Sequence, residues 1–414
     1  MSPQREDAEA RSVAEAVARR GYGKLVAFLA ARTRDVAAAE DALSEAFASA
    51  LADWPRNGCP ANPEGWLLTV ARRKIIDAAR RRASGEAAAG ELAALAEGFE
   101  AAEAEEIPDR RLALMFACAH PAIEQGVRAP LMLQVVVGLD AKQIASAFLM
   151  SPAAMGKRLV RAKDKIRAAG IPFRIPEREE LAERLDTVLD AIYTAFAEGW
   201  TDPGGTDAAR RDLTGEAFFL ARLVAEMLPE EPEGLGLLAL MLHAEARRGA
   251  RRNEAGEYVP LAEQNPELWD WEMIGEAEAL LRRAGAMGSF GRYQVESALQ
   301  SAHVHRRRTG QENWAEVVQL YDVLLELAGS PVVAINRALA IAELRGASTG
   351  LAALETVADA RLAEYQPYWA ARADLLARTG AYEEARRAYE LAIGLERDPA
   401  VRRFLQQRQS ALPD

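Results

Sequence analysis

Four basic side chains recur at intervals of one, three and four residues: Lys157, Arg158, Arg161 and Lys165. In an α-helix successive residues are rotated by about 100°, so this spacing places all four on one face. Four apolar residues fall on the opposite face: Met155, Leu159, Ala162 and Ile166. Cationic groups bind phosphates and donate hydrogen bonds to base edges, while an apolar face anchors such a helix to its own domain. The pattern therefore predicts a helix that reads duplex DNA in the major groove.

A helix–turn–helix over residues 139–167 would position this basic face. Its first helix has a short apolar stripe: Ile144, Ala145 and Phe148. The break falls at residues 149–151, where Ser151 is a good N-cap and Pro152 suits the first position of the second helix. We expect six DNA-binding residues here: Ser151, Ala154, Lys157, Arg158, Arg161 and Lys165. The alternative is a surface helix whose basic face is only solvated.

A second basic segment lies at residues 66–82, with six basic residues and one acidic residue. Three Pro and two Gly interrupt the preceding loop at 55–65. In the helix beginning near Trp66, an apolar face and a polar face separate: Leu67, Ala71, Ile75 and Ala78 against Thr69, Arg72, Arg73 and Arg80. The alternative is a helix whose last bases satisfy its own macrodipole. That accounts for the bases at 80–82 but not for those at 72–74.

Residues 36–54 are predicted to form one amphipathic helix before this loop. Its apolar residues recur at three- and four-residue steps: Val36, Ala39, Leu43, Ala46, Phe47, Ala50 and Trp54. Three acidic residues are expected on the other side: Glu40, Asp41 and Glu45. This helix and the basic helix after it form a first helical module.

Net charge is unevenly distributed along the 414 residues. Residues 1–82 carry +3, residues 83–109 carry −8, residues 110–174 carry +8 and residues 175–414 carry −14, within a total of −11. Two basic modules thus flank an acidic spacer, and a large acidic body follows. Since the positive charge is concentrated locally, the overall acidity does not exclude nucleic-acid binding.

The two modules resemble the region 2 and region 4 domains of extracytoplasmic-function sigma factors, a group within the sigma-70 family. The resemblance rests on Asp35 with AEDA at 39–42, on Phe47, on WLLTVARRKIIDAARR at 66–81 and on the helix–turn–helix. It covers residues 12–170, and the order of the modules and the acidic spacer agree with it.

This resemblance implies core RNA polymerase, at its clamp and flap regions, and promoter DNA as partners. The 36–54 helix would bind the clamp through five residues: Asp35, Glu40, Asp41, Glu45 and Phe47. The following loop and helix would capture the melted −10 element through six: Asn62, Trp66, Thr69, Arg72, Arg73 and Arg80. The helix–turn–helix would read the −35 element. The spacer at 83–109 is either a flexible linker or an acidic segment threaded through the polymerase channel.

The remaining residues exceed what these modules need. Gly310, Gly346 and Gly380 recur at a nearly constant interval, and each closes a helix-like decamer. The stretch at 371–399 resembles the tetratricopeptide pattern, so repeats that pack as helix pairs and bind an unknown protein or peptide are expected. The alternative is an irregular helical bundle. The chain thereby resembles a subgroup of these sigma factors with a long helical extension.

No catalytic constellation is evident, so an enzyme, a metal site and a cofactor are not expected. Cys59 and Cys118 are far apart in sequence, and Cys118 with His120 supplies only two of the four ligands of a structural zinc site. The run His305–Arg308 could bind anions, although a solvated helix face also explains it. The charged segment 1–20 and the lack of a long apolar run favour a cytoplasmic protein without membrane contact.

An all-α fold follows from the richness in Ala, Leu, Glu and Arg and from the absence of an alternating strand pattern. The expected parts are a region 2 domain, an acidic linker, a region 4 domain, a helical extension and repeats: 1–82, 83–109, 110–174, 175–300 and 301–414. The expected function is an alternative sigma factor with a regulatory carboxyl-terminal domain. A DNA-binding activator with a repeat-type sensor domain is the alternative, and a scaffold with an incidental helix–turn–helix is a third.

Overall fold

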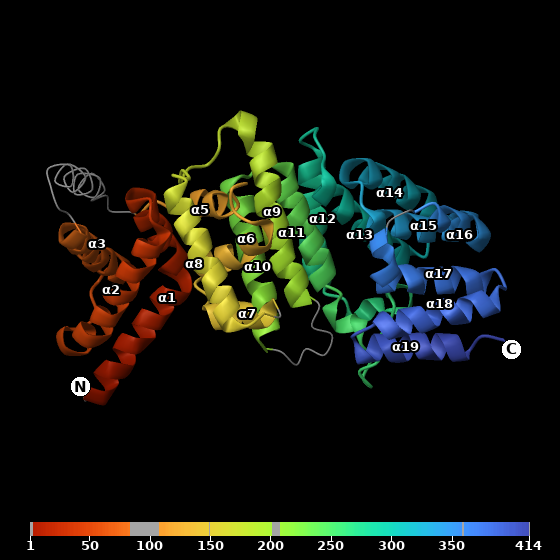
Figure 1. The fold of residues 1–414 in the computed structure, drawn as a ribbon, viewed down its shortest axis with the longest axis horizontal. Coiled ribbons are helices and arrows are strands. Elements are labelled where there is room, and N and C mark those ends of the chain that lie inside the picture. The colour runs from red at the N-terminus through yellow and green to blue at the C-terminus, as the bar shows by residue number, and fades with distance from the viewer. Residues whose placement is uncertain (1–2, 83–106, 149, 201–207, 358–359, 414) are drawn as a thin grey trace. The chain divides into compact units, whose positions relative to one another are not determined.

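The computed structural model describes residues 3–82, 107–148, 150–200, 208–357 and 360–413. Every regular element in these ranges is helical, and one isolated antiparallel bridge joins Arg252 to Tyr258. The all-α prediction is therefore confirmed (Figure 1). The chain forms two compact units, residues 1–223 and residues 224–414. Most of the spacer expected at 83–109 lies outside the described residues.

Three helices open the first unit: α1 (Pro3–Thr33), α2 (Val36–Asn57) and α3 (Pro63–Arg82). Helix α2 begins where predicted because the Asp35 carboxylate accepts a hydrogen bond from the Ala38 amide at 3.0 Å. It ends at Gly58, whose φ of 86° few other residues tolerate. Helix α3 begins after Asn62, whose side-chain oxygen accepts from the Gly65 amide at 2.9 Å. Helix α2 packs against both α1 and α3.

Seven elements complete this part of the chain: α5 (Arg111–Cys118), α6 (Gln125–Met132), the π-helix η1 (Leu133–Val137), α7 (Ala141–Ala147), α8 (Pro152–Ala168), α9 (Arg178–Trp200) and α10 (Ala208–Met227). Pro130 lies within α6 and has no amide hydrogen, and the chain continues as η1 three residues later. Gly138, in the left-handed region at φ 93°, ends η1 before the helix–turn–helix. Helices α7 and α8 pack against each other, as the sequence pattern predicted.

The second unit begins with an almost wholly buried helix, α11 (Pro232–Glu245). All residues from 234 to 243 are buried, because α12 (Trp271–Gly285) and α13 (Arg292–Thr309) both pack against α11. The Glu233 carboxylate also accepts hydrogen bonds from the amides of Tyr293 and Gln294, at 2.9 and 3.1 Å, at the start of α13. Three short 3₁₀ helices separate α11 from α12: η2 (Arg248–Arg251), η3 (Leu261–Glu263) and η4 (Pro266–Leu268).

Six helices and one 3₁₀ turn follow: α14 (Trp314–Ala328), α15 (Pro331–Arg345), α16 (Ala347–Glu355), η5 (Ala360–Glu364), α17 (Gln366–Arg378), α18 (Tyr382–Leu395) and α19 (Pro399–Ser410). The three glycines singled out in the sequence separate α13 from α14, α15 from α16 and α17 from α18. Their φ angles are 70°, 92° and 83°. Small residues bring paired helices close, since a Cβ on Gly350 would lie 2.4 Å from the Cβ of Ala342.

Candidate nucleic-acid interface

The helix–turn–helix has the local structure that its sequence predicted. The Ser151 hydroxyl accepts a hydrogen bond from the Ala154 amide at 3.2 Å and caps α8, with Pro152 at the first helical position. The four apolar residues of α8 are each at most 5% exposed: Met155, Leu159, Ala162 and Ile166. Ile144 and Ala145 of α7 are fully buried beside them. The apolar face of α8 is therefore confirmed.

The opposite face of α8 is open to solvent. Lys157, Arg161 and Lys165 are exposed, as is Ser151 at the start of the helix, and Ala154 is half-buried. The Arg158 guanidinium instead binds Glu124 at 3.1 Å and is 38% exposed. An exposed pair of this kind contributes at most about 1 kcal/mol, so a phosphate can displace Glu124 at small cost. These six positions remain predicted DNA contacts.

The residues expected to bind the −10 element lie at the start and along one side of α3. The Trp66 ring packs edge-on against Trp54 with centroids 5.5 Å apart. The Thr69 hydroxyl donates a hydrogen bond to the Gly65 carbonyl at 2.9 Å. The Asn62 side chain caps the same helix by accepting a hydrogen bond from the Gly65 amide. Both polar side chains thus stabilise their own helix, and a nucleic acid would have to share them.

Cationic groups are distributed unevenly along α3. Arg73 and Arg80 are exposed, whereas Arg72 is half-buried. Arg80 lies 3.6 Å from Asp77, and Lys74 lies 3.0 Å from Glu45 of α2. Both pairs are solvent-exposed, so they leave this side of the helix available for a phosphate backbone.

Helix α2 confirms most of its expected amphipathic pattern and corrects one position. Six of its seven apolar residues are buried, and Phe47 is half-buried. Asp41 and Glu45 are exposed, as predicted. Glu40 was expected beside them, but it is only 8% exposed. The expectation was wrong because α1 and α8 pack against this flank of α2, a tertiary contact that helical periodicity cannot reveal.

Glu40 is the centre of a small polar network between α1, α2 and α8. The Lys163 ammonium lies 2.8 Å from one carboxylate oxygen, and both side chains are largely buried. The Tyr22 hydroxyl donates to the other oxygen at 3.4 Å. Burial raises the pKa of Glu40, and the attraction of Lys163 counteracts that rise. A second pair joins Arg167 of α8 to Asp35 at 3.2 Å.

Two glycines make the same contact region unusually close. A Cβ on Gly23 of α1 would lie 1.8 Å from the carbonyl oxygen of Val136 in η1. A Cβ on Gly138 would lie 2.9 Å from the Tyr22 ring. The sequence pattern did not single out Tyr22, Gly23, Lys163 or Arg167. Lys163 and Arg167 lie outside the basic face of α8. That position was the feature of the sequence that could have indicated a contact within the protein in place of a contact with DNA.

Cys118 and His120 take structural positions. Burial raises the pKa of the fully buried Cys118 thiol. His120 Nδ1 accepts a hydrogen bond from the Ala122 amide at 3.1 Å, and burial together with Arg184 lowers its pKa. Within the described part of the chain, no three His, Cys, Asp or Glu side chains are grouped to hold a metal ion. No described helix is long and apolar enough to span a bilayer.

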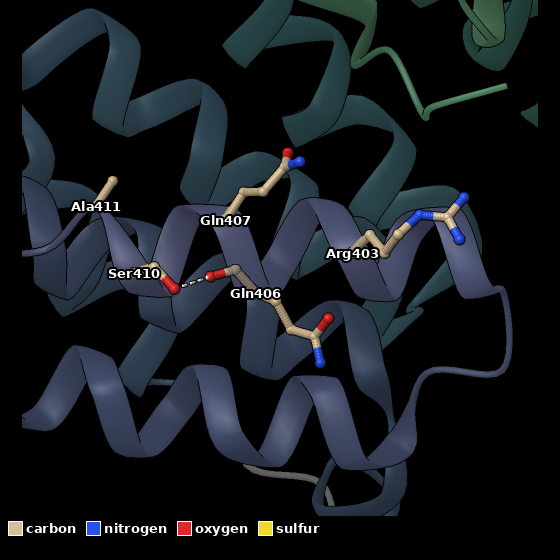
Figure 2. A pocket seen from close by; sticks show the side chains of 5 residues that line it. All are labelled: Arg403, Gln406, Gln407, Ser410 and Ala411. Carbon is tan, nitrogen blue, oxygen red and sulfur yellow. Dashed lines mark hydrogen bonds between the residues drawn. The ribbon is translucent and has the colours of Figure 1, made fainter. Parts of the chain in front are cut away.

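A hollow of about 500 Å³ lies along α19 (Figure 2). Its lining comes from α19 and the residue that follows it: Arg403, Gln406, Gln407, Ser410 and Ala411. The hydrogen bond drawn there, from the Ser410 hydroxyl to the Gln406 carbonyl at 2.9 Å, belongs to the helix itself. One cation among amides on one helix does not form a reaction centre, so this hollow adds no chemistry to the interface.

Family models match two parts of the chain. Residues 17–85 match sigma-70 region 2. This segment contains the second half of α1 and the whole of α2 and α3. Residues 184–285 match a family of unknown function, DUF6596. No solved structure matches the chain significantly.

Two relatives extend the comparison. An uncharacterized protein of Rhizobium meliloti is 39% identical over 368 residues, which cover 87% of each chain. A probable RNA polymerase sigma factor of Xanthomonas campestris pv. campestris, RfaY, is 34% identical over 200 residues. That second match covers 44% of this chain and 46% of the relative.

The region 2 match and the partial likeness to a sigma factor support the assignment of the chain to the sigma-70 family of RNA polymerase sigma factors. Members of this family are non-enzymatic transcription initiation factors. At that level the sequence-based prediction is confirmed. The chain belongs to the same family as the Rhizobium meliloti protein, which it matches over most of its length.

Proposed function

We propose that the chain is an alternative sigma factor of the extracytoplasmic-function type, which binds core RNA polymerase and directs it to its own promoters. One observation carries this proposal: a single unit holds both a region 2 module and a capped helix–turn–helix with an exposed basic face. A conventional DNA-binding activator needs the second module but has no use for the first. The cytoplasm, where core polymerase meets DNA, is the proposed location.

In this proposal the two modules read different forms of DNA. Exposed Arg73 and Arg80 would hold the backbone of the unpaired −10 strand, while Trp66 offers an aromatic face to a base. The exposed bases of α8 would contact the −35 duplex in the major groove. The acidic spacer at 83–109 would connect them, either as a tether or inside the positively charged polymerase channel.

Polymerase binding in this proposal has a cost inside the molecule. Asp35 and Glu40, two of the five expected polymerase-binding residues, are paired with Arg167 and Lys163 of α8. Before α2 can present both carboxylates to the clamp, these pairs have to separate. Core polymerase therefore competes with α8 for the same acidic side chains.

The decisive experiment is run-off transcription with purified core polymerase that lacks other sigma factors. Transcripts that depend on the promoter sequence and on this chain support the proposal. Specific duplex binding without any core binding would favour the activator alternative. If the chain neither binds core polymerase nor supports transcription from several candidate promoters, the proposal is wrong.

We infer that the second unit regulates the first. Residues 224–414 carry a charge of −8 in the same chain as basic DNA-binding modules, so electrostatic masking of the basic faces would weaken with salt. Helix pairs that turn at Gly310, Gly346 and Gly380 support tetratricopeptide-like repeats, which would bind a protein or peptide partner.

Truncation tests this inference at a defined place. A stop after Glu230, in the turn between α10 and α11, keeps every helix of the first unit. The truncated chain should initiate more transcription at low salt and approach the full chain at high salt. Unchanged promoter-specific transcription at every salt concentration would rule out regulation by the second unit.

A further inference from the structure

A cavity of about 310 Å³ opens between α12 and α13 in the second unit. Basic side chains, apolar side chains and one tryptophan ring line it together. The lining includes His305 and Arg308, the two ends of the run that the sequence marked as a candidate anion site. Neither region 2 nor the helix–turn–helix contributes to it.

Three exposed basic side chains of this cavity have no partner among the described residues: Arg282, His305 and Arg308. Their sequence neighbours behave differently. Arg283 donates to the Pro229 carbonyl and Arg307 to the Gln264 carbonyl, each at 2.6 Å. Guanidinium groups that converge on a cavity without a carboxylate partner are suited to a carboxylate or phosphate ligand.

One acidic side chain limits the positive charge of the cavity. Glu278 accepts a hydrogen bond from the Ser301 hydroxyl at 2.6 Å, which fixes one carboxylate oxygen. Its second oxygen can accept a hydrogen bond from a hydroxyl or ammonium group. With Arg282 and Arg308, the cavity then carries a net charge of about +1 when His305 is neutral.

The rest of the lining is apolar. Ile274 and Val304 are each 4% exposed and form the floor. Trp271 is 40% exposed, and its indole N–H donates to the Pro266 carbonyl at 3.1 Å, which holds the ring in place. An apolar floor and an aromatic wall stabilise a hydrophobic group, which a purely solvated basic face would not require.

Two basic groups, His243 and Arg247, lie behind the cavity. His243 is fully buried, its Nε2 lies 3.6 Å from Glu278, and neither ring nitrogen has a described hydrogen-bond partner. Burial and the nearby Arg247 lower the pKa of His243 to about 4. Burial and Arg251 lower the pKa of Arg247 to about 10. At pH 7 His243 is therefore neutral, and Arg247 remains the charged group of the two.

We propose that this cavity binds a small organic anion that carries an apolar group. Arg282 and Arg308 hold the carboxylate or phosphate, and Trp271 with the floor residues contacts the apolar group. Glu278 selects against a second negative charge. This proposal is independent of the proposed role in transcription, because ligand binding to the cavity can be measured without RNA polymerase.

Isothermal titration calorimetry of the full chain tests the site with four probes: phenylacetate, phenyl phosphate, inorganic phosphate and benzyl alcohol. We expect at least one aromatic anion to bind about tenfold more tightly than inorganic phosphate or benzyl alcohol, since each lacks one of the two features. Comparison of the first two probes shows which anionic group the arginines prefer. Equal binding of aromatic anion and inorganic phosphate, or no binding of any probe, would overturn the proposal.

Two variants that alter the cavity, together with one control, test where the probes bind. The double variant Arg282→Ala with Arg308→Ala removes both guanidiniums and should weaken binding of the aromatic anion by about 100-fold. The matched control is Arg345→Ala with Arg387→Ala, which removes two exposed arginines outside the cavity and should leave the affinity unchanged. Gly275→Leu should block the cavity while the fold is kept, because a Cβ there meets nothing within 4 Å.

The last variant separates ligand contact from a structural role. Glu278→Gln keeps the acceptor for Ser301 but removes the negative charge, so it should tighten binding of the anion. Unchanged affinity in all variants that alter the cavity would show that the probes bind elsewhere.

Discussion

Gly23→Ala tests whether region 2 and the helix–turn–helix domain are packed together in the free chain. The new Cβ would lie 1.8 Å from the Val136 carbonyl oxygen, whereas real Cβ atoms keep at least 3.0 Å, so α1 and η1 must move apart. The Val136 atoms that it meets are backbone, and a Cβ has no freedom of rotation, so no side-chain movement relieves the clash. Overpacking of this kind costs about 1–3 kcal/mol, and the better helix propensity of Ala returns up to about 1 kcal/mol.

Because a 1.8 Å contact is at the severe end of overpacking, we expect a net loss of about 1–2 kcal/mol in the free energy of opening between α1 and η1. Hydrogen exchange measured by mass spectrometry should then be about 5–30-fold faster in peptides from these two helices. Gly215→Ala is the matched control, because Gly215 is exposed within α10 and its Cβ would meet nothing within 4 Å. The control should leave exchange in α1 and η1 unchanged and slow it locally in α10. Equal exchange in wild type and Gly23→Ala would refute the close packing of the two domains.

Three further changes have defined outcomes. Lys163→Ala leaves the Glu40 carboxylate buried without its cation, and urea unfolding should show a loss of about 2–4 kcal/mol at pH 8. The pKa of Glu40 is already raised in the folded protein, and loss of Lys163 would raise it further. At pH values above the ordinary carboxyl pKa, the folded variant then binds more protons than the unfolded chain, so its stability falls as the pH rises. The loss of stability should therefore be smaller at pH 5 than at pH 8. Arg161→Ala should weaken −35-dependent transcription by about 5- to 150-fold and spare core polymerase binding; loss of core binding instead would contradict the assignment of α8. Ser151→Ala should lower the stability of α8 by about 1 kcal/mol in thermal unfolding, and no change would mean that the hydroxyl cap is unimportant.

The local features of the helix–turn–helix were predictable because they depend on neighbours in sequence. A Ser-Pro step, a three- and four-residue apolar period and an opposed basic face together define α8 and its buried side. The glycine turns of the second unit were predictable for the same reason, since Gly at positive φ is favoured where one helix ends and the next begins within one to four residues.

Long-range contacts were not predictable from these patterns. Glu40 belongs to the polar side of α2 by periodicity, yet α8 covers it and supplies Lys163 from 123 residues away. The cavity between α12 and α13 likewise joins Trp271 to Arg308, whose closeness no sequence motif shows. The expected division into five parts stays a prediction.

The sequence by itself therefore determined the helical class, the two basic modules and the sigma-70 resemblance, because hydrophobic period, capping and charge act over a few residues. Only the tertiary structure decided which charges are free to bind partners. Burial of Glu40 against α8, and exposure of Arg161 on another face of α8, depend on how whole helices pack. The free energy of a charge is set by the solvent and charges around it in space, and these come from distant parts of the chain.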